Sequence, residues 1–196
     1  MHITKLSLVN YRNFKNVNFI FNKGINTIVG ENGSGKSNLF RAMRLLLDNS
    51  MSRSAINLTE NDFCRALGNW RGHWVIISME FSDISSDEAS QSLFLHGLGN
   101  AGDEVVTRAT YNLIFRPKAN IRQALALLPQ GNINALEAYL EAITIDDYET
   151  VLTGKSSINF NDPVAYKSIV GDFERVIFPA RLNNSDCGIK LPNIDR

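Results

Sequence analysis

Three features of the sequence predict an α/β fold arranged around one glycine-rich loop. Residues 25–29 form a short, β-branched apolar run that predicts a buried strand. Residues 30–37 follow directly and are rich in glycine. An amphipathic helix is then predicted to begin near Lys36, from the spacing of Leu39, Phe40, Met43, Leu46 and Leu47. A strand, a loop and a helix in this order are typical of layered α/β proteins.

The loop carries a phosphate-binding pattern. Residues 30–37 read Gly-Glu-Asn-Gly-Ser-Gly-Lys-Ser, which matches G-x-x-x-x-G-K-[ST], the P-loop, at every fixed position. Glycines let the backbone turn consecutive N–H groups toward phosphate oxygens, and the helix N-terminus favours an anion. In this pattern Lys36 reaches the β- and γ-phosphates and is the candidate catalytic residue, while the Ser37 hydroxyl is the candidate ligand of Mg²⁺. The sequence therefore predicts a nucleoside triphosphate site with Mg²⁺.

The candidate nucleotide-binding residues belong to this loop, to the helix start and to an upstream turn: Gly30, Asn32, Gly33, Ser34, Gly35, Lys36, Ser37, Asn38 and Arg12. Asn38 is expected near the α-phosphate, with an exposed position at the helix start as the alternative. Arg12 is expected to contact phosphate, adenine or DNA backbone, and a surface position after a strand is the alternative. Asp62 and Asp83 are expected to be solvated loop acids rather than metal or ribose ligands. No Asn-Lys-x-Asp guanine motif is present, which favours ATP.

Alternating apolar residues predict further strands at 3–9, 17–21, 74–81 and 105–115. The first two precede the loop and are expected to form an antiparallel layer, and the last two are expected to pair antiparallel with each other. Residues 48–71 are polar and predict an irregular connection with a turn or short helix around 60–67.

Helices are predicted in the second half of the chain. One carries Ile121, Ala124, Leu125 and Leu128, one is capped by Asn134, one follows Asp162-Pro163, and a short one covers 88–96. Residues 154–157, Gly-Lys-Ser-Ser, look like the end of a second P-loop. However, Glu149 stands where the first glycine is required, so a turn is expected there.

Composition limits the classes of protein to consider. A chain of 196 residues with 44% hydrophobic and 20% charged residues is long enough and apolar enough for a folded domain. The net charge is zero, yet residues 1–50 hold seven Lys and Arg against two acids, which suits a basic nucleotide-binding end. Cys64 and Cys187 fit no metal spacing. Without a signal peptide or an apolar run of about 20 residues, a cytoplasmic protein with no membrane contact is expected.

The residues around the loop resemble a known family. Tyr-Arg-Asn-Phe at 11–14, Gly-Ile-Asn at 24–26 and the P-loop resemble the head domain of RecF/SMC-type ABC ATPases. The helix at 41–48, Asn-Asp-Phe at 61–63, and the stretches at 145–162, 171–173 and 178–179 resemble OLD-family (overcoming lysogenization defect) ATP-dependent endonucleases. The resemblance implies an α/β P-loop NTPase fold of the ABC ATPase head type, here an N-terminal lobe with an antiparallel β-subdomain and a helical segment.

The resemblance also implies a function. It implies ATP hydrolysis that controls a Toprim-type, DNA-cleaving nuclease in antiviral defence, through ATPase heads that form a homodimer or higher oligomer, with DNA and an accessory defence protein as partners. The Walker B acid, the signature motif and the Toprim carboxylates are absent from the sequence. We therefore expect residues 1–196 to be the N-terminal part of the head domain, inactive alone, with the remaining motifs beyond them.

The expected divisions are 1–50 for strands, P-loop and first helix, 72–118 for the antiparallel β-lobe and 119–178 for the helical segment. Two alternatives stay open. One is a RecF/SMC-like DNA-repair or chromosome-maintenance ATPase without its own nuclease. The other is a nucleotide-binding regulatory module that does not turn over.

Overall fold

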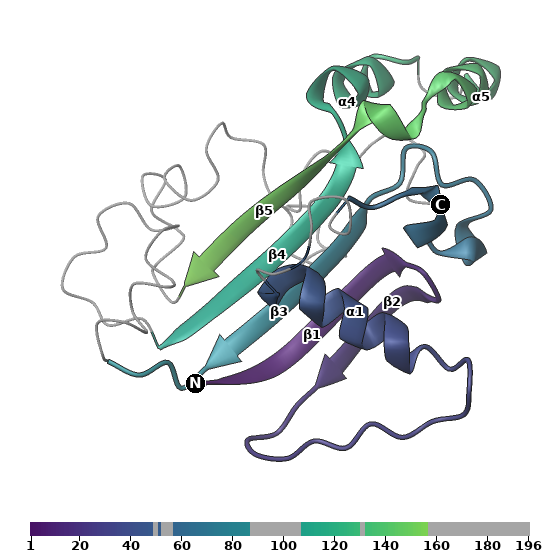
Figure 1. The fold of residues 1–196 in the computed structure, drawn as a ribbon. Coiled ribbons are helices and arrows are strands. Elements are labelled where there is room, and N and C mark those ends of the chain that lie inside the picture. Colours follow the sequence, from purple (N-terminus) through teal and green to yellow (C-terminus); the bar gives the residue numbers. More distant parts are fainter. Residues whose placement is uncertain (49–50, 52–56, 87–106, 130–131, 157–196) are drawn as a thin grey trace.

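A computed structural model of the chain describes residues 1–48, 51, 57–86, 107–129 and 132–156. These residues form one antiparallel five-stranded sheet with a helix across one face and two helices at one end (Figure 1). The strands are β1 (His2–Tyr11), β2 (Phe14–Ile20), β3 (Val75–Ser82), β4 (Arg108–Pro117) and β5 (Tyr148–Ser156). Their order across the sheet is β2-β1-β3-β4-β5.

The first two strands form a tight hairpin. Tyr11 pairs with Phe14, so Arg12 and Asn13 alone make the turn. The strands predicted at 3–9 and 17–21 are confirmed, but they do not form a layer of their own, because β1 also pairs along its other edge with β3. The predicted antiparallel pairing of the strands at 74–81 and 105–115 is confirmed as β3 with β4, although residues 105 and 106 lie outside the described part.

Helix α1 (Lys36–Leu47) crosses one face of the sheet (Figure 1). It buries Leu39, Ala42 and Leu45 against the same core that holds Leu6, Leu8, Ile77, Met79 and Leu113. The predicted helix is confirmed, but its predicted apolar stripe is partly wrong. Phe40 is 52% exposed and Leu47 is 44% exposed, because the helix presents these side chains away from the sheet.

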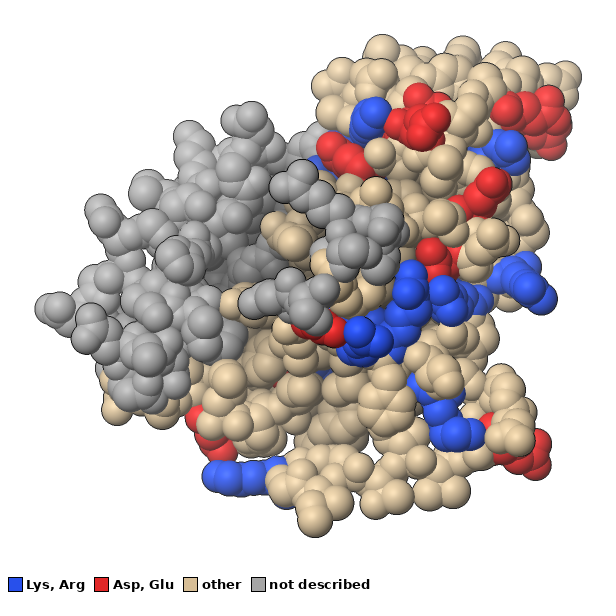
Figure 2. Space-filling view, viewed as in Figure 1, with Lys and Arg blue, Asp and Glu red and all other residues tan. Residues whose placement is uncertain are grey.

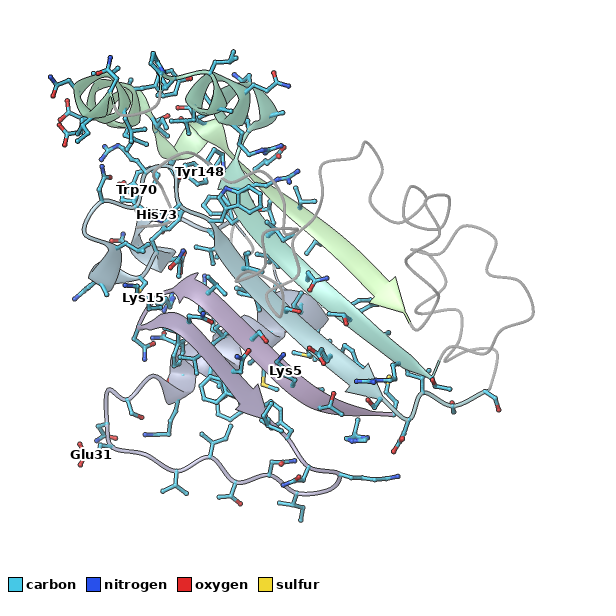
Figure 3. The ribbon with its side chains drawn as sticks, turned by 180° about the vertical axis from the view of Figure 1, so that it is seen from behind. Lys5, Lys15, Glu31, Trp70, His73 and Tyr148 are labelled. Atoms are coloured by element: carbon cyan, nitrogen blue, oxygen red, sulfur yellow. The ribbon has the colours of Figure 1, made fainter. Side chains whose placement is uncertain are left out.

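Residues 57–74, which lead into β3, lie at the end of the sheet. They include two single-turn 3₁₀ helices, η1 (Glu60–Asp62) and η2 (Arg65–Leu67), which confirms the short helix predicted around 60–67. Phe63 packs edge-on against Tyr148 at 5.5 Å between ring centroids, and Trp70 lies 5.5 Å from the same tyrosine (Figure 3). The Gly72 N–H donates a 2.7 Å hydrogen bond to the Tyr148 hydroxyl. These aromatic contacts fix this segment against β5.

The segment after β4 departs from the predicted helical segment of 119–178. It contains α4 (Ala119–Ala126), α5 (Ile133–Ala142) and the short η3 (Ile145–Asp147), and then strand β5, which was not predicted. The predicted cap at Asn134 is wrong. Asn132 caps α5, because its side chain accepts a hydrogen bond from the Ala135 N–H at 3.1 Å. Residue 154, predicted to start a turn, pairs with Tyr111 inside β5.

Residues 25–29 are the main difference from the predicted fold. They run as an extended segment with no strand pairing, below α1 in Figure 1. Ile25 is 98% exposed and Val29 is 88% exposed. A groove of about 360 Å³ separates this segment from α1, and it is lined by His2, Ile3, Phe21, Asn22, Gly24, Asn26, Ile28, Phe40 and Met43. The predicted buried strand is therefore wrong for the described part of the chain, in which no strand lies beside it.

Two predicted helices, at 88–96 and after Asp162-Pro163, lie outside the described residues. Within the described ranges, no helix combines the length and the apolar character needed to cross a membrane.

Candidate functional site: the glycine loop and the start of helix α1

The glycine-rich loop leads the chain into the N-terminus of α1. Gly33 has a φ of 84° and Gly35 a φ of 101°, values that an L side chain adopts only with strain. Gly35 is the N-cap of α1, and no side chain caps the helix there. The first helical bond runs from the Leu39 N–H to the Gly35 carbonyl at 2.9 Å. The N–H groups of residues 36–38 therefore have no acceptor within the helix, as in known anion sites.

At two glycines of the loop, an added side chain does not fit unless a neighbouring side chain moves. A Cβ built on Gly35 would lie 2.1 Å from the Asn13 Nδ2, and one built on Gly30 would lie 2.8 Å from the Ser34 Oγ. Both distances are shorter than a carbon atom tolerates next to a polar atom. Close packing therefore favours glycine at both positions, and at Gly35 the positive φ favours it as well.

Lys36 folds back over the loop. Its Nζ donates hydrogen bonds to the Gly30 carbonyl at 2.6 Å and to the Glu31 carbonyl at 2.7 Å. An ammonium group has three N–H donors, so these two bonds leave one donor for an anion. The Lys36 side chain therefore lies over the loop rather than turned away from it.

The remaining loop residues are exposed. Asn32, Gly33, Ser34 and the Ser37 hydroxyl face solvent in the described structure. Glu31 lies at the outer edge of the molecule and points away from the body (Figure 3). The acid within the loop therefore points away from the body of the protein.

Arg12 and Asn38 are brought together beside the loop. The Arg12 Nη1 donates to the Asn38 Oδ1 at 2.9 Å, and its Nε donates to the Asp62 Oδ1 at 2.9 Å. Arg12 is half-buried and stacks on the Tyr11 ring at 5.7 Å. Burial raises the pKa of the Tyr11 hydroxyl above its ordinary value. Arg12 is thus more than a surface residue after a strand, and it is linked to the α1 N-terminus through Asn38.

The two aspartates have different settings. Asp62 was expected to be a solvated loop acid, but it is buried. Its carboxylate accepts hydrogen bonds from the Arg12 Nε at 2.9 Å and from the Thr59 N–H at 3.0 Å. Asp83 is exposed, as expected, and a 3.1 Å hydrogen bond from Lys23 lowers its pKa. Sequence reasoning also missed Asn13, whose side chain reaches the loop. Its place in the turn after Arg12 was the available signal.

The face that carries α1 is basic. Figure 2 shows Lys and Arg side chains gathered across this face, and α1 itself contributes Lys36, Arg41 and Arg44. Arg44 is exposed and pairs with Asp48 at 2.9 Å. Several acidic side chains in this view lie toward α4 and α5 (Figure 2). A positive face beside a bare helix N-terminus attracts an anion such as a triphosphate.

Over the described ranges, no group of three or more His, Cys, Asp or Glu side chains is arranged to hold a metal ion. Mg²⁺ usually takes one or two protein oxygens and completes its shell with phosphate oxygens and water. The exposed Ser37 hydroxyl at the first turn of α1 fits that role for a metal that arrives with a nucleotide.

Comparison with known proteins places the loop in a family context. The model of a family described as "AAA ATPase domain" matches residues 1–174. Over 113 residues the chain is 33% identical to the DNA replication and repair protein RecF of Desulforamulus reducens. The matched region covers 54% of this chain and 29% of that protein.

Shorter matches agree with this. The chain is 50% identical over 46 residues to RecF of Oceanobacillus iheyensis, covering 24% of the chain and 12% of that protein. It is 45% identical over 47 residues to the DNA double-strand break repair Rad50 ATPase of Methanococcus maripaludis, covering 24% and 5%. The matched parts thus span less than a third of these relatives. A solved structure from a study of "ATP-driven dimerization and DNA stimulated activation of SMC ATPases" aligns over 86% of this chain and 79% of that one, with a TM-score of 0.41 and 18% identity.

Proposed function

Because the chain belongs to the AAA ATPase domain family and has the α/β P-loop fold of an ABC-type ATPase head, we propose that residues 30–38 bind ATP together with Mg²⁺. The observation that carries this proposal is the uncapped N-terminus of α1, which follows two glycines of positive φ and lies under the Lys36 ammonium. Backbone donors, a helix dipole and a point charge then meet at one place, and a phosphate chain is the ligand that uses all three.

Each residue of the site has a defined task. The N–H groups of residues 33 and 35–38 bind phosphate oxygens, whereas the Ser34 N–H donates to the Glu31 carbonyl within the loop. Lys36 extends its third donor to the β- and γ-phosphates. The Ser37 hydroxyl is one ligand of the metal. Bound with ATP, Mg²⁺ neutralises charge on the β- and γ-oxygens. Arg12 holds Asn38 at the helix start and, in this proposal, adds a positive charge near the phosphates or the adenine.

Hydrolysis needs groups beyond this loop. In the described part of the chain, Glu31 is the acid in the loop and it points outward. We propose that the acid and the second surface over the nucleotide come from other parts of the complete protein or from a second copy, so that ATP closes two heads into a dimer. The exposed residues 31–34 and the bare apolar side chains of Ile25 and Val29 support this, since both leave room for a covering surface.

We further propose that the complete protein couples ATP to work on DNA in the cytoplasm. The named relatives RecF and Rad50 favour a DNA-repair or chromosome-maintenance ATPase. The resemblance at residues 41–48 and 61–63 favours an OLD-type protein, in which ATP controls a Toprim nuclease in antiviral defence, with an accessory protein as a further partner. Cleavage of plasmid DNA by the complete protein separates the two. Metal-dependent cleavage that responds to ATP supports the nuclease, and ATP hydrolysis without cleavage supports the repair class.

Titration of a fluorescent ATP analogue in the presence of Mg²⁺ tests the proposed nucleotide site. Saturable binding to the 196-residue chain is expected, with a loss of at least tenfold in Lys36→Ala. Arg44→Ala is the matched control, because Arg44 is also a cation of α1 but pairs with Asp48 away from the loop. Equal binding by wild type and Lys36→Ala would rule out the proposed site.

A further inference from the structure

The turn between β1 and β2 reaches across to the glycine loop through Asn13. The Asn13 Nδ2 donates to the Ser34 carbonyl at 3.2 Å, and the Asn13 Oδ1 accepts from the Asn38 Nδ2 at 2.8 Å. The same amide lies against Gly35, where any Cβ would collide with it. Asn13 therefore contacts the loop at its last glycine and the helix at its first turn.

This contact is the end of a continuous chain of hydrogen bonds. Asn38 bonds to Arg12, and Arg12 bonds to the buried Asp62 carboxylate. Asp62 is in turn fixed by Thr59, whose N–H and hydroxyl both bond to the Asp62 Oδ2. The backbone joins in as well, since the Arg12 N–H donates to the Asp62 carbonyl at 2.8 Å. Hydrogen bonds between side chains thus connect the glycine loop to the buried Asp62 carboxylate.

The turn that presents Asn13 is itself held in an unfavourable conformation. Arg12 has a φ of 51°, in the left-handed region that a non-glycine residue seldom adopts. Such a conformation persists where surrounding contacts fix it, and Asp62 accepts two hydrogen bonds from Arg12, one from its side chain and one from its backbone N–H. A strained turn that is anchored on one side and contacts the glycine loop on the other suits a positioning element.

We propose that Asn13 is a positioning residue that holds the Ser34–Gly35 part of the loop in its phosphate-binding shape without touching the nucleotide. This inference rests on the proposed function, since it assumes that the loop binds phosphate. Both polar atoms of the Asn13 side chain are engaged by protein, one by Ser34 and the other by Asn38. The residue therefore acts through the backbone donors around Gly35.

A positioning role has a signature that a direct contact lacks. Every ligand that binds through the loop N–H groups depends on the shape of the loop, so ATP and ADP should both lose affinity by the same factor when Asn13 is removed. A residue that contacts the γ-phosphate would affect ATP and leave ADP unchanged. For Asn13→Ala we expect a loss of about tenfold for both nucleotides, the size of one or two lost hydrogen bonds.

The test is a titration of the chain with fluorescent analogues of ATP and ADP in Mg²⁺, alongside thermal unfolding. The matched control is Asn16→Ala, an exposed asparagine of the same hairpin that lies in β2 and pairs with Val9. Asn13→Asp is a second variant that keeps the shape and turn preference of the side chain but replaces the donor that faces the Ser34 carbonyl. It should lose binding as Asn13→Ala does, even if the alanine variant is unstable.

Coupling within the chain of bonds gives a further readout. Asn38→Ala should weaken binding by itself, and Asn13→Ala should add little in that background, because the two side chains act as one unit. Equal losses for ATP and ADP together with this non-additivity support the proposal. Unchanged affinity in both Asn13 variants, a loss confined to ATP, or full additivity would each overturn it. If wild type and Asn16→Ala bind neither nucleotide, the proposed function itself fails, which is a distinct result.

Discussion

A methyl group added to Gly35 should disable the loop without unfolding the domain. In Gly35→Ala the new Cβ meets the Asn13 Nδ2 at 2.1 Å and the Asn13 Cγ at 2.8 Å, and the backbone must keep a φ of 101°. The left-handed backbone costs about 1–2 kcal/mol for an L residue. Displacing Asn13 breaks its two hydrogen bonds, at about 1 kcal/mol each. The sum, about 3–4 kcal/mol, corresponds to a loss of nucleotide affinity on the order of 150- to 900-fold.

Two glycines serve as matched controls for the backbone part of that cost. Gly24 has a φ of 100° and Gly33 a φ of 84°, and at neither does an added Cβ meet another atom within 4 Å. Gly24→Ala lies outside the loop and should leave affinity unchanged. Gly33→Ala strains the loop without a collision, so its loss of affinity should be smaller than that of Gly35→Ala.

The assay is equilibrium titration of a fluorescent ATP analogue, with thermal unfolding to confirm that the sheet is intact. The nearest atoms to the new methyl group all belong to the Asn13 side chain. Gly35→Ala should therefore cost less in an Asn13→Ala background than in wild type. Wild-type affinity in Gly35→Ala would refute this reasoning, as would an equal loss in Gly24→Ala.

Three further variants test other parts of the structure. Lys36→Ala should remove nucleotide binding while its unfolding midpoint stays close to that of wild type, as the ammonium bonds only to exposed loop carbonyls; a large fall in the midpoint would contradict this. Asp62→Asn should destabilise the fold by about 2–3 kcal/mol in urea unfolding, since it removes the charge of a buried carboxylate that pairs with the half-buried Arg12, whereas Asp83→Asn should have the smaller effect. Burial raises the pKa of the Tyr148 hydroxyl above its ordinary value of 10. The stability that the neutral hydroxyl contributes is therefore fully present below pH 10, and it is lost as the pH rises through the pKa of the folded protein. Alkaline unfolding should then be shallower in Tyr148→Phe, which at neutral pH costs about 1–2 kcal/mol by leaving the Gly72 N–H unbonded; identical pH profiles would contradict the assignment.

The local signals in the sequence predicted most elements correctly. Strand alternation located β1 to β4, and the P-loop pattern placed the start of α1 at Lys36. Strand β5 was missed because Tyr148–Ser156 has a glycine and several polar residues, and its pairing with β4 is a long-range contact that no local pattern reports. The cap of α5 was placed two residues late, since Asn132 and Asn134 are equally good caps by residue type.

The wrong predictions around the loop concern long-range contacts, which the local sequence does not report. Residues 25–29 have the composition of a buried strand, but a strand forms only where another strand accepts its hydrogen bonds, and the described residues offer none. In the same way, the apolar spacing of α1 does not say which of its flanks meets the sheet. Phe40 and Leu47 have the right spacing for a buried stripe and are exposed.

The sequence predicted the glycine loop of the candidate site but not the residues that contact the loop from other parts of the fold. Residues 30–37 were identified by their pattern alone, because the chemistry of phosphate binding fixes both residue type and spacing. Asn13 and Asp62 were not identified, because their roles depend on the tight β1–β2 turn and on the fold of the loop before β3. An asparagine in a turn and an acid in a connection have many ordinary uses, and only the tertiary structure shows that they meet.

The central claim is that the backbone of the glycine loop binds a phosphate chain. The most direct measurement follows the amide resonances of the ¹⁵N-labelled chain during titration with MgATP. The account predicts that the largest shifts fall on the amides of Gly33, Gly35 and Lys36, and that the Gly24 amide, in a similar backbone conformation outside the loop, does not move. Saturable shifts that leave residues 31–38 unchanged, or no shifts at millimolar nucleotide, would contradict it.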